Sequence, residues 1–327
     1  MDFIREYQAF LQPDWSEVAG LMQEALQSDI RLLNQANAHI LSHNGKMLRP
    51  ALSLLVGRAC AGSVDGNGRK IAAAAELMHN ATLLHDDVAD RSAERRGVPT
   101  TSSLMGNDAA VLLGDYWLVK AMDLILSCGP HSERCIRIFS KTLSDLAEGE
   151  MLQLQKAVQG DTSRDDYFRI IYSKTASLFE AACVSAAVCA GAPDELLEAA
   201  REFGIRVGIA FQIQDDILDY TATDALGKPT GMDLKEKKIT LPLLGALLAV
   251  SDERNRLVRR MVCEIDSHPE HPARIREFVL QEGGIAYAAS VLEEYVAKAQ
   301  EALRVFPAGE AVAMLSALTR FIGTRTV

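Results

Sequence analysis

Residues 177–192 read SLFEAACVSAAVCAGA, a stretch that is apolar on most faces of a helix. Residues 241–250, LPLLGALLAV, have the same character. A helix with apolar side chains all around belongs in the interior of a large bundle. Small residues such as Ala182, Ala186 and Ala187 would let neighbouring helices approach closely or line a cavity. We therefore expect an all-α fold.

Helical periodicity continues outward from this stretch in both directions. The predicted helices cover about residues 15–41, 49–60, 68–88, 107–127, 132–158, 164–190, 194–220, 239–249, 252–265, 272–281, 285–304 and 308–322. Breaks such as HNGKMLRP, AGSVDGNG and SHPEHP carry glycine, proline and polar residues. No segment alternates as a strand does, and no repeat or linker divides the chain. We predict one domain over residues 1–327, a single helical bundle around a central apolar cavity.

Composition and charge exclude several classes of protein. Aromatic residues make up only 6% of the chain, and a formal charge of −10 would repel nucleic acid while leaving room for a small phosphate in a local basic pocket. The six cysteines form no CxxC pair, so they indicate free thiols in a reducing compartment rather than zinc ligands. The amino terminus lacks the pattern of a signal peptide, and no apolar run is long enough for a transmembrane segment. These features predict a cytoplasmic protein.

Two acidic clusters with the same DDxxD spacing interrupt apolar helical runs. The first lies in TLLHDDVADRSAERR, residues 82–96, and the second in FQIQDDILDY, residues 211–220. Their members are Asp86, Asp87 and Asp90 in the first, and Asp215, Asp216 and Asp219 in the second. On a helix, positions i and i+4 share a face, so each cluster aims two carboxylates at one point. Carboxylates among apolar residues are costly unless a cation compensates them.

Oxygen ligands without histidine or cysteine favour magnesium, which prefers a few carboxylates together with water and substrate phosphate oxygens. One such cluster alone could be a solvated helix face, but two copies make that interpretation weak. We expect the two clusters to face each other across the bundle and to hold several ions.

Basic residues lie beside both clusters. Lys46 and Arg49 in GKMLRP stand where a loop enters a helix, a position suited to a phosphate. Arg95 and Arg96 follow the first cluster, and Lys228, Lys237 and Lys238 follow the second. Each alone would be read as a surface charge. Their shared position beside the carboxylates favours binding of diphosphates.

These motifs resemble those of the all-trans isoprenyl (polyprenyl) diphosphate synthases of medium- and long-chain type. GKMLRP is similar to the family's GKxxRP loop, DDVADRSAERRG to its first aspartate-rich motif and FQIQDDILD to its second, and the match runs from about residue 45 to residue 242. HNATLLHDD, GNDAAVLLGDYWL, SKTASLF and LGKPTGMDL also have counterparts in the family. One departure is Arg91, where many long-chain relatives have an acidic residue; it replaces no predicted ligand.

The resemblance implies a role for each matching residue. The metal ligands would be Asp86, Asp87, Asp90, Asp215, Asp216 and Asp219, around about three magnesium ions. The allylic diphosphate would be bound by Arg95, Lys174, Lys228 and Lys238, and isopentenyl diphosphate by Lys46, Arg49, His79 and Arg96. Thr175 and Gln212 would lie near the allylic carbon. The predicted catalytic residues are these two together with Lys174, Asp86, Asp87, Asp90, Asp215 and Asp216. His79 could equally be a core histidine.

The family chemistry implied is a head-to-tail (1'-4) condensation of isopentenyl diphosphate with an allylic primer, which would be geranyl, farnesyl or geranylgeranyl diphosphate. Ionisation of the primer, attack by the double bond and loss of a proton would give an all-trans polyprenyl diphosphate. The resemblance also implies a homodimer, with the helices near 107–127 and 132–158 as interface.

Product length would depend on residues one and two turns before Asp86. Here these are Ala81 and Thr82, then Met78 and Leu77, without the bulky aromatics of farnesyl-forming relatives. We predict a product longer than farnesyl, with Met78, Leu77, Val119 or Met122 closing the tunnel deeper down; each of these could also be an ordinary core residue.

Two other interpretations remain open. A class I terpene cyclase uses the same bundle but needs no second diphosphate site. GKMLRP and the paired arginines favour a second diphosphate site and so argue against a cyclase. A non-catalytic subunit of a heteromeric synthase would be expected to lack carboxylates from one motif, and here both motifs are complete.

Overall fold

The computed structural model describes residues 2–43, 45–95, 97–221 and 231–325. Two of the predicted site residues, Arg96 and Lys228, lie outside this described part. The chain forms two compact units: Met1–Ser140, Leu178–Arg201 and Leu303–Ser316 make the first, and Lys141–Ser177, Glu202–Ala302 and Ala317–Val327 the second. The prediction of a single domain stays a prediction, and each unit is described on its own.

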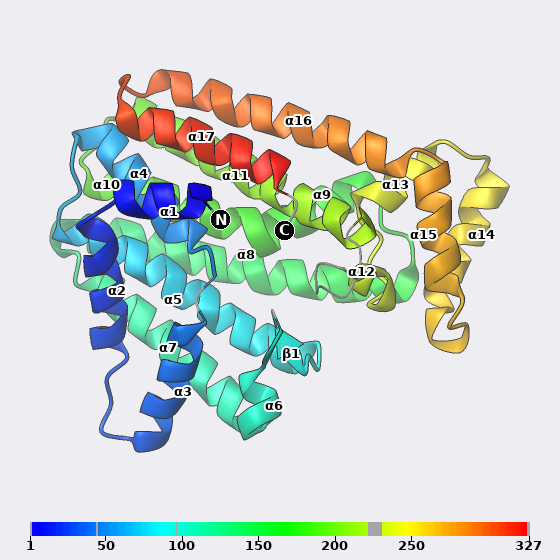
Figure 1. Ribbon diagram of the computed structural model, residues 1–327, viewed down its shortest axis with the longest axis horizontal. Coiled ribbons are helices and arrows are strands. Elements are labelled where there is room, and N and C mark those ends of the chain that lie inside the picture. Colours follow the sequence, from blue (N-terminus) through cyan, green and yellow to red (C-terminus); the bar gives the residue numbers. More distant parts are fainter. Residues whose placement is uncertain (1, 44, 96, 222–230, 326–327) are drawn as a thin grey trace. The chain divides into compact units, whose positions relative to one another are not determined.

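The amino-terminal half of the chain is a succession of helices with one short hairpin (Figure 1). In order these are α1 (Asp2–Phe10), α2 (Asp14–Ala25), α3 (Arg31–Ser42), α4 (Leu48–Ala61), α5 (Gly66–Ala89), β1 (Glu94–Arg95), β2 (Val98–Pro99), α6 (Thr101–Met105), α7 (Asn107–Leu126), η1 (Gly129–His131) and α8 (Ser132–Gln159). The two strands pair antiparallel and are the only strands among the described residues. The all-α prediction is therefore confirmed, apart from this hairpin.

The remaining elements are helical as well. They are α9 (Arg164–Ile171), the π-helical η2 (Tyr172–Ala176), α10 (Ser177–Cys189), α11 (Asp194–Thr221), α12 (Met232–Lys235), α13 (Leu241–Leu248), α14 (Asp252–Cys263), η4 (Ile265–Ser267), α15 (His271–Gln281), α16 (Gly284–Ala302), η5 (Leu303–Val305) and α17 (Glu310–Thr324). None of the helices in the described part of the chain has the length and apolar character needed to cross a membrane.

The core of the first unit is built on α5, which packs against α4 and α7. The run Ala72–Ala75 is fully buried, since alanines let neighbouring helices come close. Gly114 of α7 lies against the ring of His85: a Cβ at position 114 would lie 2.4 Å from His85 Nε2, so a larger residue there would displace this ring. This packing fixes the end of α5, where the first acidic cluster stands.

The second unit has its own core between α9, α11 and the helices α13 to α16. The predicted apolar helix at 241–250 is α13, whose residues from Leu241 to Leu247 are all buried, and it packs along α16 (Figure 1). This confirms that a helix apolar on all faces is an interior element.

The long helix predicted over residues 15–41 is wrong, because it is divided into α2 and α3. At the division, side chains form the hydrogen bonds to the backbone groups that a continuous helix would otherwise pair. The amide of Asn34 donates to the Ser28 carbonyl at 2.7 Å and accepts from the Ser28 N–H at 3.1 Å, and the amide of Asn37 donates to the Leu26 carbonyl at 2.8 Å. Asparagine competes with the helical hydrogen bonds in this way, so the apolar periodicity continues while the helix does not.

Candidate active site

The first acidic cluster stands at the carboxyl end of α5. Asp87 is buried, Asp86 is half-buried and Asp90, the residue that caps the helix, is exposed. Backbone carbonyls already give this end of a helix a partial negative charge, so carboxylates here are unfavourable without a cation. The position is a poor one for a merely structural acid and a good one for a cation-binding acid.

Arg95 supplies one positive charge to this cluster. The β1–β2 hairpin brings it back toward α5, and its Nε donates to Asp87 Oδ1 at 2.8 Å. Burial raises the pKa of Asp87 above its ordinary value, while the charge and hydrogen bond of Arg95 act in the opposite sense. Arg95, which is predicted to bind the allylic diphosphate, is thus held in place by Asp87, a predicted metal ligand.

The GKMLRP loop leads directly into α4. Met47 adopts a left-handed backbone conformation (φ 48°) as the capping residue, without a side-chain cap. The carbonyl of Lys46 accepts a hydrogen bond from the Tyr7 hydroxyl, and buried Arg49 lies with its guanidinium 4.6 Å from the centre of the Phe179 ring. The loop is therefore fixed by packing at both basic residues.

The residues predicted to control product length lie on α5. Leu77, Met78 and Ala81 are buried, and half-buried Thr82 donates its hydroxyl to the His79 carbonyl at 2.8 Å. His79 itself is half-buried on the same helix. Val119 was predicted as a possible tunnel floor, but it is 54% exposed on α7, so it closes no buried tunnel within one chain.

The second acidic cluster lies near the carboxyl end of α11, in the second unit. Asp216 is buried and accepts two hydrogen bonds, from the Tyr167 hydroxyl at 2.6 Å and from the Gln212 amide at 2.8 Å. Burial raises the pKa of Asp216 well above its ordinary value and nearby Asp233 adds to this, while the two donors lower it. A bound cation would stabilise the ionised form of Asp216, which burial disfavours.

Asp219 holds the segment that follows the second motif. Its carboxylate accepts from the backbone N–H groups of Met232 at 3.1 Å and of Asp233 at 3.2 Å, and its carbonyl accepts from the Gly231 N–H. Burial raises the pKa of Asp219, and these backbone bonds lower it. The segment that begins at Gly231 is thereby held against the second motif by hydrogen bonds to Asp219.

Thr175 and Gln212, predicted to act near the allylic carbon, are in contact. The Thr175 hydroxyl donates to Gln212 Oε1 at 2.8 Å, which completes a chain of hydrogen bonds from Thr175 to Asp216. Thr175 belongs to the π-helical turn η2, a feature often found at functional sites. Gly149 of α8 makes room for this turn, since a Cβ there would lie 2.5 Å from the Cβ of Ser173.

Lys174 and Lys238 each pair with a carboxylate in the same unit. Lys174 forms an ion pair with Glu150, and Lys238 with Glu236. Both lysines are half-buried. The ion pairs therefore hold both lysine side chains in place within the second unit, which also contains the second acidic motif.

Comparison with known proteins decides the family. Residues 30–279 match the family model described as polyprenyl synthetase. The chain belongs to the polyprenyl synthetase family. It is 37% identical to the all-trans-nonaprenyl-diphosphate synthase (geranyl-diphosphate specific) of Rhodobacter capsulatus over 98% of this chain and 97% of that protein. It is 38% identical to the octaprenyl diphosphate synthase of Escherichia coli over 90% of each.

Solved structures of polyprenyl synthases have the same fold. The structure of a polyprenyl synthase from Caulobacter crescentus, complexed with calcium and isoprenyl diphosphate, gives a TM-score of 0.92 at 33% identity and covers 99% of this chain and 98% of that one. The predicted identity as a medium- or long-chain isoprenyl diphosphate synthase, a prenyltransferase of all-α fold that makes chains longer than farnesyl, is thereby confirmed.

Three residues that contact the second acidic cluster are not predicted from the sequence. Arg325, near the carboxyl terminus, pairs with Asp215 at 2.8 Å, and Tyr167 is the donor to Asp216. Asp233 is the third: burial and then the charge of Asp219 raise its pKa to about 7, while Lys238 lowers it. Only Asp233 carried a signal, because it stands in GMDLKEKK, directly after the second motif.

Proposed function

We propose that the two acidic motifs together perform the head-to-tail condensation of isopentenyl diphosphate with an allylic diphosphate. The observation that carries this proposal is that each motif holds a buried carboxylate, Asp87 in one and Asp216 in the other, whose pKa burial raises. Carboxylates withdrawn from water favour a bound cation, and a diphosphate needs cations to leave.

The residues fit magnesium. All six predicted ligands offer oxygen, and none of the six is a histidine or a cysteine. The related Caulobacter crescentus protein was crystallised with calcium, another cation that takes oxygen ligands. We assign Asp86, Asp87, Asp90, Asp215, Asp216 and Asp219 to about three magnesium ions. When bound, these ions neutralise the charge that grows on the departing diphosphate.

Basic side chains supply the remaining positive charge. For the allylic diphosphate we propose Arg95, Lys174, Lys228 and Lys238, and for isopentenyl diphosphate Lys46, Arg49, His79 and Arg96. Arg95 and Lys174 already pair with Asp87 and Glu150, so each cation is held ready and exchanges one anionic partner for another when substrate enters.

Thr175 and Gln212 would stabilise the allylic cation. Because the Thr175 hydroxyl donates its proton to Gln212, the lone pairs of its oxygen remain available to face positive charge. The Gln212 amide is in turn fixed by Asp216, so neither side chain needs to reorganise during the reaction. The proton lost in the final step would pass to the departing diphosphate.

The growing chain would extend along the apolar face of α5. Buried Ala81 leaves space where an aromatic residue would block the path, and Met78 and Leu77 lie one turn further on. Relatives of this chain are named heptaprenyl, octaprenyl and nonaprenyl diphosphate synthases, which supports a product in that range.

We further propose that the enzyme is a cytoplasmic homodimer. Its six cysteines are all free, which suits a reducing compartment. Large apolar residues are exposed on α7 and α8, the helices predicted to form the interface.

The proposal is tested by incubating the purified chain with labelled isopentenyl diphosphate, magnesium and each primer in turn. Chromatography of the dephosphorylated products should reveal linear alcohols longer than farnesol. A cyclic hydrocarbon would favour a terpene cyclase. Absence of elongation by the chain alone would favour a subunit of a larger enzyme. Two relatives are named heptaprenyl diphosphate synthase component 2, so the partner to add in that case would be a second component of the synthase.

A further inference from the structure

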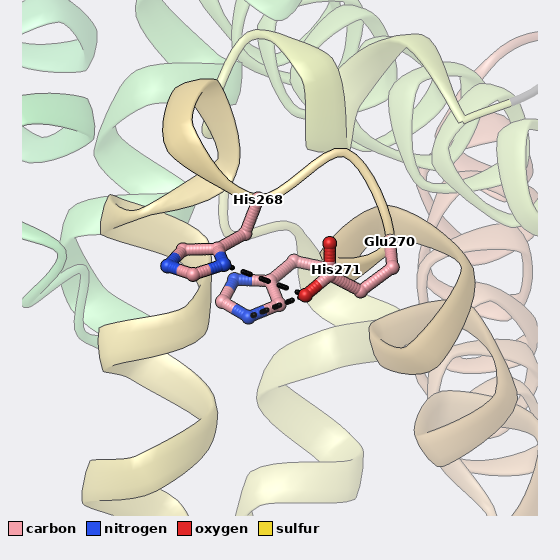
Figure 2. Close-up of side chains that lie close together, drawn as sticks. All are labelled: His268, Glu270 and His271. Carbon is pink, nitrogen blue, oxygen red and sulfur yellow. Dashed lines mark ion pairs between the residues drawn. The ribbon is translucent and has the colours of Figure 1, made fainter.

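A cluster of metal-ligating side chains lies outside both aspartate motifs, in the second unit. His268, Glu270 and His271 stand where η4 leads into α15, and Figure 2 shows the two imidazole rings beside the Glu270 carboxylate. One possible ligand atom from each residue lies within 4.8 Å of the other two. None of the three is among the residues assigned above to prenyl transfer.

Both imidazoles face the same carboxylate oxygen. His268 Nδ1 lies 3.4 Å from Glu270 Oε1, and His271 Nε2 lies 3.9 Å from that atom (Figure 2). Two ligands bound tetrahedrally to one zinc ion lie about 3.3–3.4 Å apart, given metal–ligand bonds of about 2.0–2.1 Å. The first distance is close to this value, the second exceeds it by about half an ångström, and a ligand nitrogen of each imidazole lies within 4.8 Å of the other, so side-chain rotation must bring the three ligand atoms together.

His271 is held in the form that a metal requires. Its Nδ1 lies 3.0 Å from the Met261 carbonyl, which can only accept, so Nδ1 carries the proton and Nε2 keeps its lone pair. Metal-binding histidines usually donate their second nitrogen to such an acceptor, because this fixes the tautomer and the ring. The side chain of His271 is also buried, so one ligand is in place before an ion arrives.

The other two ligands can adjust. The rings of His268 and His271 are stacked, with centres 4.5 Å apart and planes inclined by 17°. Because lone pairs of nearly parallel rings do not meet at one point, one ring must turn. His268 and Glu270 are both half-exposed, so they can turn and an ion can reach them.

We propose that His268, Glu270 and His271 form a site for a divalent transition metal of the zinc class, with solvent completing the coordination. Two imidazole nitrogens and one carboxylate oxygen suit zinc, cobalt, nickel or copper, and they do not suit magnesium. The site therefore differs in chemistry from the oxygen-only motifs. Because His271 is bonded to α14 through Met261, a bound ion braces the turn between α14 and α15.

The test uses the full-length chain without a histidine tag, stripped of metal and then saturated with magnesium. Cobalt is added and its visible absorption recorded, and zinc affinity is measured by calorimetry. The wild-type chain should give the spectrum of cobalt bound to nitrogen and oxygen ligands. His268→Ala and Glu270→Gln should each weaken zinc binding by about tenfold or more.

A matched control removes a different histidine pair. His39 lies on α3 and His43 caps the end of that helix, with the two ring centres 5.0 Å apart, and His43→Ala disrupts this pair while leaving the proposed site intact. The control should bind zinc as the wild type does, and zinc should raise the melting temperature of both but not of His268→Ala. Unchanged zinc affinity in His268→Ala, or binding lost in His43→Ala, would overturn the proposal, and so would a wild-type chain that binds no zinc. Elongation with magnesium should be unaffected by His268→Ala, so failure here leaves the prenyltransferase assignment standing.

Discussion

Arg325 and Tyr167 stabilise two carboxylates of the second motif from distant parts of the chain: Arg325 pairs with Asp215, and the Tyr167 hydroxyl donates to Asp216. Arg325, more than a hundred positions from Asp215, shares no local pattern with it. Tyr167 likewise reads as a core aromatic until its hydroxyl is placed against Asp216. Periodicity reports which face of a helix is buried, and it says nothing about which distant donor satisfies a buried acid.

Arg325 should compete with magnesium for Asp215. Its guanidinium lies 2.8 Å from the carboxylate and 3.9 Å from the centre of the Phe211 ring, so it neutralises this acid when no metal is bound. Arg325→Met should lower the magnesium concentration for half-maximal elongation about fivefold, as expected for an ion pair worth about 1 kcal/mol. Arg325→Lys keeps the charge and serves as the control. An unchanged magnesium requirement in Arg325→Met would contradict this role.

Ala81→Phe should shorten the product. Position 81 is buried on α5, and a phenyl ring there would fill the proposed path of the growing chain. The variant should give mainly shorter alcohols on chromatography, with a melting temperature near that of the wild type. If position 81 is instead a packed core position, overpacking costs about 1–3 kcal/mol, so the melting temperature would fall and the length distribution would stay the same.

At the scale of elements, the sequence predicted the existence of the helices better than their ends. The division between α2 and α3 depends on Asn34 and Asn37. These two polar residues do not interrupt the apolar periodicity, so the pattern does not reveal the break. The π-helical turn η2 was included in a predicted helix over 164–190, because one extra residue in a turn hardly shifts the apolar stripe. Helix ends depend on single side chains, and single side chains contribute little to periodicity.

The start of α9 offers a test of such an end. Ser163 and Asp166 form a reciprocal capping box, in which Asp166 Oδ2 accepts from the Ser163 N–H at 2.9 Å, and Lys156 also pairs with Asp166 at 3.0 Å. Burial raises the pKa of Asp166, but the bonds from Ser163 and then Lys156 outweigh this and bring it below the ordinary value. Asp166→Asn should lower the free energy of unfolding at pH 7 by about 1 kcal/mol.

The sign of the pH dependence follows from the lowered pKa of Asp166. An acid whose pKa is lower in the folded state contributes stability above its unfolded pKa of about 4, and this is lost as pH falls through the folded pKa. Urea denaturation at pH 7 and at pH 3 should therefore find a smaller difference between wild type and Asp166→Asn at the lower pH. A difference that grows in acid would contradict the assignment.

At the scale of the whole molecule, the exposed apolar residues of α7 are the feature that one chain does not explain. Leu112, Val119 and Leu126 are 67%, 54% and 56% exposed and recur every seven residues, which places them on one stripe of the helix. Met151, Leu154 and Val158 form a similar exposed stripe on α8. Stripes of this kind on a water-facing helix mark a surface for a partner, and in the proposed homodimer that partner is a second copy of this chain.

Charge placed on this stripe should therefore separate the copies. Leu112→Glu combined with Leu126→Glu should convert a species with the mass of two chains into one with the mass of a single chain, measured by light scattering after gel filtration. Leu257 of α14, 55% exposed, gives the matched control, because Leu257→Glu adds the same charge at an equally exposed leucine away from α7. If the double variant keeps the mass of two chains, α7 is not the interface. If the wild type already has the mass of one chain, the stripe serves another partner, and the homodimer is wrong.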